Sequence, residues 1–278
     1  IRKVGGTADE YFPAGMATAD GGVVLVGGTP SKGNSAGDAW IYAIDGNGQV
    51  KFDSVYGTGN YFGVTARTGG GYIAVGYDAK VTARATAVDE KGVKVWDLSY
   101  SGIYLLQSPV ARPGGGYAAG TYSVNTPGKS KAAVVELDAN GNQVNLFPLG
   151  LTQATQSASI AIAPAGGYWA AGRVHDTQAD GFVARVLGDG TVPFKKIIGL
   201  PSVDESFQTL AADATGCLVG GAATASGGFG VARFDNNGVQ LWARNYGLTK
   251  DDVAYKLAPV GAAGFVLAGY TTSTPVET

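Results

Sequence analysis

Pairs of acidic residues recur at one position in this sequence and are the side chains best suited to chemistry. They occur in "ADEYF" (8–12), "VDESF" (203–207) and "KDDVA" (250–254), and each pair precedes a strand-like segment. Carboxylate oxygens are preferred ligands of Ca²⁺, and two carboxylates can also act as acid and base on a glycosidic bond. The sequence therefore predicts a calcium site at Asp9, Asp204 and Asp251, or a catalytic use of the same acids and Asp38. The alternative is that each acid caps loop amides.

Other reactive side chains are few. His175 and Cys217 are the single histidine and the single cysteine of the chain. Without a second histidine, His175 is expected to be an exposed loop residue rather than a metal ligand. Cys217 lies in the apolar run "CLVGG" and is expected to be a small buried hydrophobic residue. The arginines fall at repeat-equivalent positions, such as Arg185 and Arg233, and are expected on the surface of the repeats.

A second acidic pattern, Asp-x-x-Gly followed four residues later by an aromatic residue, is repeated along the chain. Its glycines are 44, 49, 49 and 48 residues apart, and the aromatic rule fails only at Asn145. An Asp side chain can bond to the backbone ahead of it, and Gly allows the positive φ that ends a tight turn. The pattern therefore predicts hairpin turns rather than calcium loops, which would also need a glutamate at position 12. The glycines are Gly48, Gly92, Gly141, Gly190 and Gly238.

The elements between these turns are short strands. Each unit holds four β-rich segments bounded by Gly, Pro, Asn or Asp, and a second motif, an apolar run between glycines, has the same period. Four-stranded units that repeat every 45–50 residues indicate a β-propeller with about six blades in one domain, residues 1–278. The predicted units are 8–58, 59–102, 103–151, 152–200, 201–247 and, as a sixth closed by the N-terminal segment, 248–278 with 1–7. The third strand of the sixth blade is not recognisable, so either the native chain extends further or this blade is incomplete.

The composition excludes several classes of protein. The chain of 278 residues has 45% hydrophobic and 15% charged residues, a net charge of −2 and 45 glycines. A basic stripe for nucleic acid is absent, and no run of about 18 apolar residues indicates a membrane span. The N-terminus does not resemble a signal peptide, although a mature secreted chain would look the same. We therefore expect no nucleic-acid partner and no membrane insertion.

The combination of an acidic pair, Gly-Gly-aromatic, Asp-x-x-Gly and Trp before Tyr-Gly resembles bacterial and archaeal extracellular β-propeller repeat proteins. The segment "AVDEKGVKVW" is also distantly similar to the blades of quinoprotein dehydrogenases. Those enzymes would imply eight blades, a vicinal disulfide and a metal-bound quinone, and the chain offers six repeats and one cysteine. The closer resemblance implies a secreted, periplasmic or cell-surface binding module without a resident cofactor, apart from an optional Ca²⁺.

The loops of a propeller that connect the second strand to the third, and one blade to the next, share the face around the channel mouth. Function is often carried by loops on such a rigid frame. We therefore expect ligand-binding residues among the side chains of these loops and the adjoining strand starts: Tyr77, Tyr122, Arg173, His175, Tyr270, Asp38 and Asp180.

Two functions are consistent with these patterns. The first is a non-enzymatic binding or scaffold module that recognises protein or glycan on a cell surface, alone or within a larger chain or assembly. The second is a glycan hydrolase or lyase that uses carboxylates at the channel mouth. The second requires two carboxylates that converge about 5–9.5 Å apart for hydrolysis.

Overall fold

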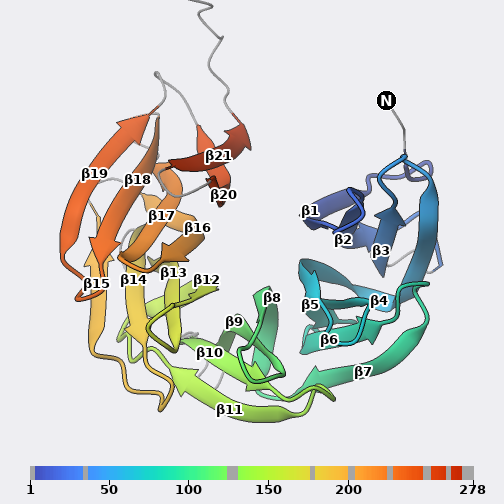
Figure 1. The fold of residues 1–278 in the computed structure, drawn as a ribbon, viewed down its shortest axis with the longest axis horizontal. Helices are drawn as coiled ribbons and strands as arrows, with labels where there is room; N and C mark the ends of the chain where they lie inside the picture. Colours follow the sequence, from blue (N-terminus) through green and yellow to red (C-terminus); the bar gives the residue numbers. More distant parts are fainter. Residues whose placement is uncertain are drawn as a thin grey trace, which may run out of the picture. The chain divides into compact units, whose positions relative to one another are not determined.

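The computed structural model describes residues 4–33, 37–123, 131–175, 179–199, 204–223, 228–246, 252–260 and 264–270. These residues form antiparallel β-sheets and contain no helix (Figure 1), so none of them forms a helix that could span a membrane. The all-β architecture predicted from the sequence is confirmed. The number of blades and the closure of the ring stay predictions; residues 4–7 are not in a strand.

The first sheet contains seven strands in sequence order because one long strand belongs to two repeats. The first half of β4 pairs with β3, up to Asp38 opposite Thr58, and the second half pairs with β5 from Gly59 onward. The strands are β1 (Tyr11–Ala17), β2 (Val23–Thr29), β3 (Asp38–Ile44), β4 (Val50–Ala66), β5 (Tyr72–Asp78), β6 (Ala83–Val88) and β7 (Lys94–Tyr100).

Three four-stranded sheets and one two-stranded sheet follow. The third repeat comprises β8 (Ile103–Ala111), β9 (Tyr117–Ser123), β10 (Lys131–Leu137) and β11 (Gln143–Pro148). The fourth comprises β12 (Ala154–Ile162), β13 (Tyr168–His175), β14 (Ala179–Val186) and β15 (Phe194–Ile198). The fifth comprises β16 (Glu205–Asp213), β17 (Gly216–Ala223), β18 (Gly228–Asp235) and β19 (Gln240–Tyr246). The last described strands are β20 (Val253–Val260) and β21 (Gly264–Tyr270).

The chain divides into two compact units, residues 1–123 with 135–146 and residues 124–134 with 147–278. In the first unit, β8 packs on β4, β5 and β6. In the second, β16 packs on β12, β13 and β14, and β20 packs on β16, β17 and β18. Each unit is thus built from sheets stacked face to face, with the first strand of one sheet against the sheet before it.

The Asp-x-x-Gly segments are hairpin turns, as predicted. In the turn after β6, Asp89 Oδ1 accepts hydrogen bonds of 2.8 Å from the amides of Lys91 and Val93, and Gly92 has φ +78°. The turns at Asp45, Asp138 and Asp235 have the same two side-chain hydrogen bonds. In each of these turns one carboxylate oxygen accepts two backbone amides and orders the turn, so the motif is structural.

Four of the five turn glycines, Gly48 being the exception, also contact an aromatic side chain of the preceding repeat. A Cβ on Gly141 would lie 2.7 Å from Trp96, and a Cβ on Gly92 would lie 2.5 Å from Phe52. In the third repeat the sequence pattern pointed to Asn145, but the structure uses Phe147, which packs at Gly190. The predicted break in the aromatic rule is therefore a shift of two residues along β11.

The prediction that Arg185 and Arg233 lie on the surface is wrong. These side chains are 4% and 7% exposed. Arg185 donates hydrogen bonds to the carbonyls of Tyr168 and Val186, at 3.1 and 2.6 Å, and lies 5.6 Å from the ring of Trp169. A guanidinium can be buried in this way because its several donors are satisfied by carbonyls at the strand ends.

A β-bulge interrupts the first strand of every repeat near one end. In β4 the register shifts between Tyr61 and Gly63, and in β1 it shifts between Tyr11 and Ala14. Opposite these bulges, a Cβ on Gly76 would overlap the carbonyl oxygen of Asn60, and a Cβ on Gly27 would overlap that of Tyr11. The repeated glycine that ends each apolar run thus admits a bulged backbone, which redirects the side chains at the strand end.

Candidate functional site

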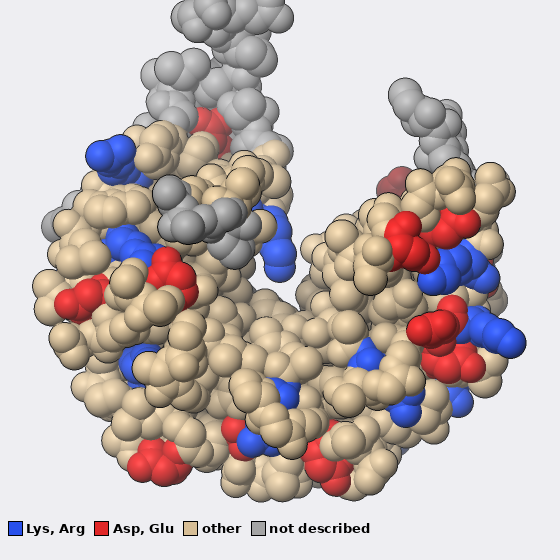
Figure 2. Space-filling model, in the orientation of Figure 1, with Lys and Arg blue, Asp and Glu red and all other residues tan. Residues whose placement is uncertain are grey.

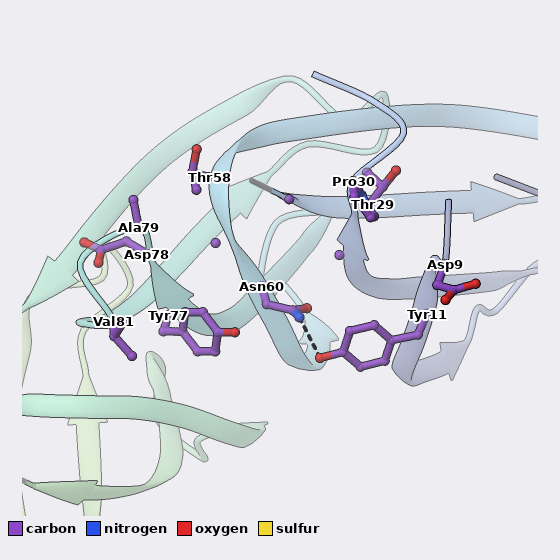
Figure 3. A pocket seen from close by; sticks show the side chains of 13 residues that line it. Asp9, Tyr11, Thr29, Pro30, Thr58, Asn60, Tyr77, Asp78, Ala79 and Val81 are labelled. Atoms are coloured by element: carbon purple, nitrogen blue, oxygen red, sulfur yellow. Dashed lines mark hydrogen bonds between the residues drawn. The ribbon is translucent and has the colours of Figure 1, made fainter. Parts of the chain in front are cut away.

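The first unit contains a pocket of about 370 Å³ at the ends of β1, β2, β4 and β5 (Figure 3). It lies where a second-to-third strand connection meets a link between repeats, which is the place that the sequence predicted for function. Its volume is in the range of small-molecule sites. The described residues that line it are Asp9, Tyr11, Gly28, Thr29, Pro30, Gly37, Thr58, Gly59, Asn60, Tyr77, Asp78, Ala79 and Val81.

Asn60 and Tyr11 form the centre of the pocket. The amide of Asn60 donates a hydrogen bond of 2.6 Å to the hydroxyl of Tyr11. Asn60 is 8% exposed, and its Oδ1 is buried and accepts no hydrogen bond. Gly28 leaves room for this arrangement, because a Cβ there would lie only 3.1 Å from the Asn60 amide group. Burial raises the pKa of the Tyr11 phenol above its ordinary value, with a smaller contribution from Tyr77, so this hydroxyl stays protonated.

Tyr77 faces Tyr11 across Asn60, and the two phenol hydroxyls point toward the same space (Figure 3). The centroid of the Phe62 ring lies 5.6 Å from that of Tyr77 and 6.4 Å from that of Tyr11, so this ring packs against both tyrosines. Tyr77 is half-buried and Tyr11 is 46% exposed, so each ring presents part of its surface to a ligand. The arrangement offers aromatic surface, hydroxyl groups and an amide within one small concavity.

A second pair of tyrosines lies in the third repeat. Tyr104 and Tyr122 stack with ring centroids 5.1 Å apart. Burial raises the pKa of Tyr122 to about 12, and Tyr104 and Tyr77 add to the rise. Tyr122 is therefore close enough to Tyr77 for an electrostatic effect, although it does not line the pocket.

The charge of the pocket is negative. Asp9 and Asp78 line it, and no Lys or Arg occurs among its described lining residues. Burial opposes ionisation of Asp78, but hydrogen bonds from Ser99 Oγ and the amides of Thr82 and Lys80 outweigh this effect and lower its pKa. Elsewhere on the face shown in Figure 2, Lys and Arg side chains lie beside Asp and Glu side chains rather than in a patch of one sign.

The neighbours of Asp9 and Asp204 show how the repeated acids are used. Beside Asp9, Glu10 accepts hydrogen bonds of 3.1 Å from the amide of Gly6 through both carboxylate oxygens. Asp204 accepts a hydrogen bond of 2.8 Å from the amide of Ala179. For Glu10 and Asp204 the structure thus shows the capping role that was the alternative to chemistry.

The metal assignment remains a prediction. Within the described ranges no three His, Cys, Asp or Glu side chains are grouped so as to hold a metal ion. Asp9 belongs to the first unit and Asp204 to the second, and Asp251 lies outside the described residues.

The remaining residues predicted for ligand binding are not gathered at this pocket. Asp38 begins β3 beside Gly37 and is 5% exposed. Arg173, His175 and Asp180 belong to β13 and β14 of the second unit, where His175 is exposed and Arg173 is half-buried. The strand β21 ends at Tyr270, whose side chain lies outside the description.

The sequence analysis missed Tyr11, Asn60 and Val81 of the pocket. Tyr11 and Asn60 lie at or near the start of the first strands of two repeats. The sequence signal for both is the glycine that ends the following apolar run, because the bulged backbone at Tyr11 and Asn60 leaves no room for a Cβ there. Val81 carried a different signal, because "DAKV" (78–81) has the form Asp-x-x-Gly with valine in the place of glycine.

The chain is similar to solved structures of propeller type. It matches a protein of unknown function from Dyadobacter fermentans with a TM-score of 0.61, 11% identity and coverage of 94% of this chain and 93% of that one. A protein of unknown function from Bacteroides caccae matches with a TM-score of 0.55 and 16% identity, over 90% of this chain and 83% of that one. A subtype N10 neuraminidase-like protein of A/little yellow-shouldered bat/Guatemala matches with a TM-score of 0.50 and 11% identity, over 85% of this chain and 81% of that one. At these identities the likeness concerns the fold alone.

No protein-family model matches the chain, and no curated protein does so either. The comparisons and the observed sheets therefore support a propeller-like fold and leave the activity to be argued from the pocket.

Proposed function

We propose that this protein is a non-enzymatic binding module that recognises a neutral saccharide in the pocket between Tyr11 and Tyr77. The proposal rests on the pair of half-exposed tyrosines on either side of Asn60, in a concavity whose described lining contains no Lys or Arg. Aromatic faces pack on the C–H surface of a sugar ring, while hydroxyl and amide groups satisfy its hydroxyls.

The charge of the pocket favours a neutral ligand over an anionic one. Sialic or uronic acids would place a carboxylate near Asp9 and Asp78, and the described lining offers no arginine or lysine to compensate them. Burying such a charge without a partner is unfavourable. The similarity to the neuraminidase-like protein therefore concerns the fold, and we infer no substrate from it.

Binding fits the pocket better than hydrolysis. A general acid needs a raised pKa, whereas hydrogen bonds hold the pKa of Asp78 below its ordinary value and occupy both its oxygens. Asp9 would have to work without Asp78 as the proton donor. If the protein were a hydrolase, incubation with the bound oligosaccharide would release shorter products, and Asp9→Asn would abolish the release.

The proposal extends to location and partners. A saccharide-binding propeller without cofactor suits a secreted, periplasmic or cell-surface protein that contacts glycans or glycoproteins. The resemblance of the repeats to extracellular propeller proteins supports this location.

Calorimetric titration with neutral and acidic oligosaccharides tests the proposal. We expect binding of at least one neutral trisaccharide, no binding of its uronic-acid counterpart, and a loss of about tenfold or more for Tyr77→Ala, since truncating a central aromatic anchor usually costs more than 1 kcal/mol. The matched control is Tyr255→Ala, which removes a tyrosine that is 53% exposed in the second unit. Equal affinities of these two variants would reject this pocket as the site.

A further inference from the structure

Val81 has a backbone conformation that valine rarely adopts. Its φ is +56°, in the left-handed region, and among the described non-glycine residues only Ser108 shares a positive φ. The left-handed conformation brings Cβ close to the following carbonyl oxygen, and branching at Cβ makes the crowding worse. Val81 is therefore a strained residue.

The turn that contains Val81 can be compared with the other hairpin turns of the chain. In the turn at Asp78 the amide of Val81 donates 2.9 Å to the carbonyl of Asp78, and the amides of Lys80 and Thr82 donate to its carboxylate. The turn at Asp89 repeats these hydrogen bonds, with Gly92 in the position of Val81. The same hydrogen bonds form with glycine at this position, so the turn itself gives no reason for a strained valine.

Burial in the core does not offset the strain at Val81. It is 40% exposed, and it lines the pocket, where Figure 3 shows it beside Tyr77. Strained residues that the surrounding structure maintains tend to occur at ligand sites. The combination of strain, exposure and a place in the pocket wall singles out Val81.

We propose that Val81 is a specificity-determining residue, whose isopropyl group forms an apolar wall for the methyl group of an N-acetylated sugar. This inference rests on the saccharide-binding function proposed above. Ala79, Asn60 and Thr58 also line the pocket, and the last two supply polar groups for the acetamido amide and the ring hydroxyls. An N-acetyl substituent combines a methyl group with an amide and carries no charge, as the acidic pocket requires.

Val81→Gly separates the two roles of this residue. We expect the variant to have a higher Tm than the wild type, because the turn loses its strain, and to bind tri-N-acetylchitotriose about 10-fold more weakly, the low end for a lost apolar contact in a pocket. Affinity for cellotriose, which lacks the acetamido groups, should be lower than for tri-N-acetylchitotriose in the wild type and nearly unchanged by the substitution. Lys80→Ala is the control in the same turn, since Lys80 does not line the pocket.

The outcomes are distinguishable. A higher Tm with unchanged affinity for tri-N-acetylchitotriose would show that the valine has no part in recognition and would overturn the inference. A wild type that prefers cellotriose would also overturn it, while leaving saccharide binding intact. A wild type that binds neither these trisaccharides nor any other neutral oligosaccharide would reject the proposed function together with the inference. An unchanged or lower Tm for Val81→Gly would refute the argument from strain.

Discussion

Substitution of Gly141 by alanine tests how neighbouring repeats are joined. Gly141 has φ +84°, and a Cβ there would lie 2.7 Å from the Trp96 ring of the preceding repeat. The indole N–H of this ring donates a hydrogen bond of 3.3 Å to the carbonyl of Ala139, and Tyr100 holds the facing backbone by donating 2.7 Å to the carbonyl of Gly141. An added methyl group therefore meets a ring that has little freedom to move.

The magnitude follows from two separate costs. A left-handed conformation costs an alanine roughly 1–2 kcal/mol, and overpacking a well-filled contact costs roughly 1–3 kcal/mol more. Gly48→Ala provides the matched control in the same compact unit, because Gly48 has φ +77° and nothing lies within 4 Å of the place of its Cβ. Gly48→Ala should incur only the first cost, so the two variants should differ by about 2 kcal/mol.

Urea denaturation followed by tryptophan fluorescence measures this difference. With an m-value of roughly 2 kcal/mol/M, the midpoint of Gly141→Ala should lie about 1 M below that of Gly48→Ala. In a Trp96→Ala background the ring is gone, and Gly141→Ala should then cost no more than Gly48→Ala. Equal midpoints of the two glycine variants in the wild-type background would refute the reasoning that the glycine is a seat for the aromatic ring.

Two further predictions concern acid stability and the strand bulge. The hydrogen bond of 2.6 Å from Arg233 lowers the pKa of Asp213 to about 2, below its value of about 3.9 in the unfolded chain. The contribution of Asp213 to the free energy of unfolding is therefore complete above about pH 3.9 and is lost as the pH falls toward 2. Asp213→Asn should therefore lower the urea midpoint at pH 7 and flatten its decline between about pH 4 and pH 2; a parallel decline would contradict the assignment. Gly76→Ala, whose Cβ would overlap the carbonyl oxygen of Asn60, should lower the Tm and abolish ligand binding, whereas Gly230→Ala, with its nearest neighbour atom at 3.4 Å, should do neither. Similar Tm values for these variants would contradict the role of the bulge.

The features of the fold that repeat were predictable from the sequence. Asp-x-x-Gly identifies a turn wherever it occurs, since Asp accepts the same two amides and Gly allows the same φ, so a period of 44 to 49 residues was visible. Phe147 was missed because the bulky residue shifted by two positions while the space it fills stayed the same. Packing constrains volume at a location, and a sequence pattern constrains only spacing.

The pocket was less predictable because it depends on exceptions to the repeat. Tyr77 could be proposed as a loop aromatic, but its partners Tyr11 and Asn60 come from first strands that looked like core. The burial of Arg185 and Arg233 was missed for a related reason, since a charged side chain is placed inside only when its donors find carbonyls, and these belong to other strands.

The position after the repeated glycine connects the regular frame to the variable site. Gly27 lies opposite the bulge of β1, and Gly76 lies opposite the bulge of β4. The residue that follows each of these glycines therefore has the equivalent position in its repeat. At the first of these positions the residue is Gly28, which leaves room for Asn60, and at the second it is Tyr77, which supplies a ring. The pocket forms where a glycine in one repeat lies near a tyrosine in the next. Neither residue takes part in the bulge, so both can vary without a change in the strands. If this is correct, Gly28→Leu should eliminate the pocket and its ligand binding while leaving the bulge intact, because Asn60 would be displaced without any change at Gly27.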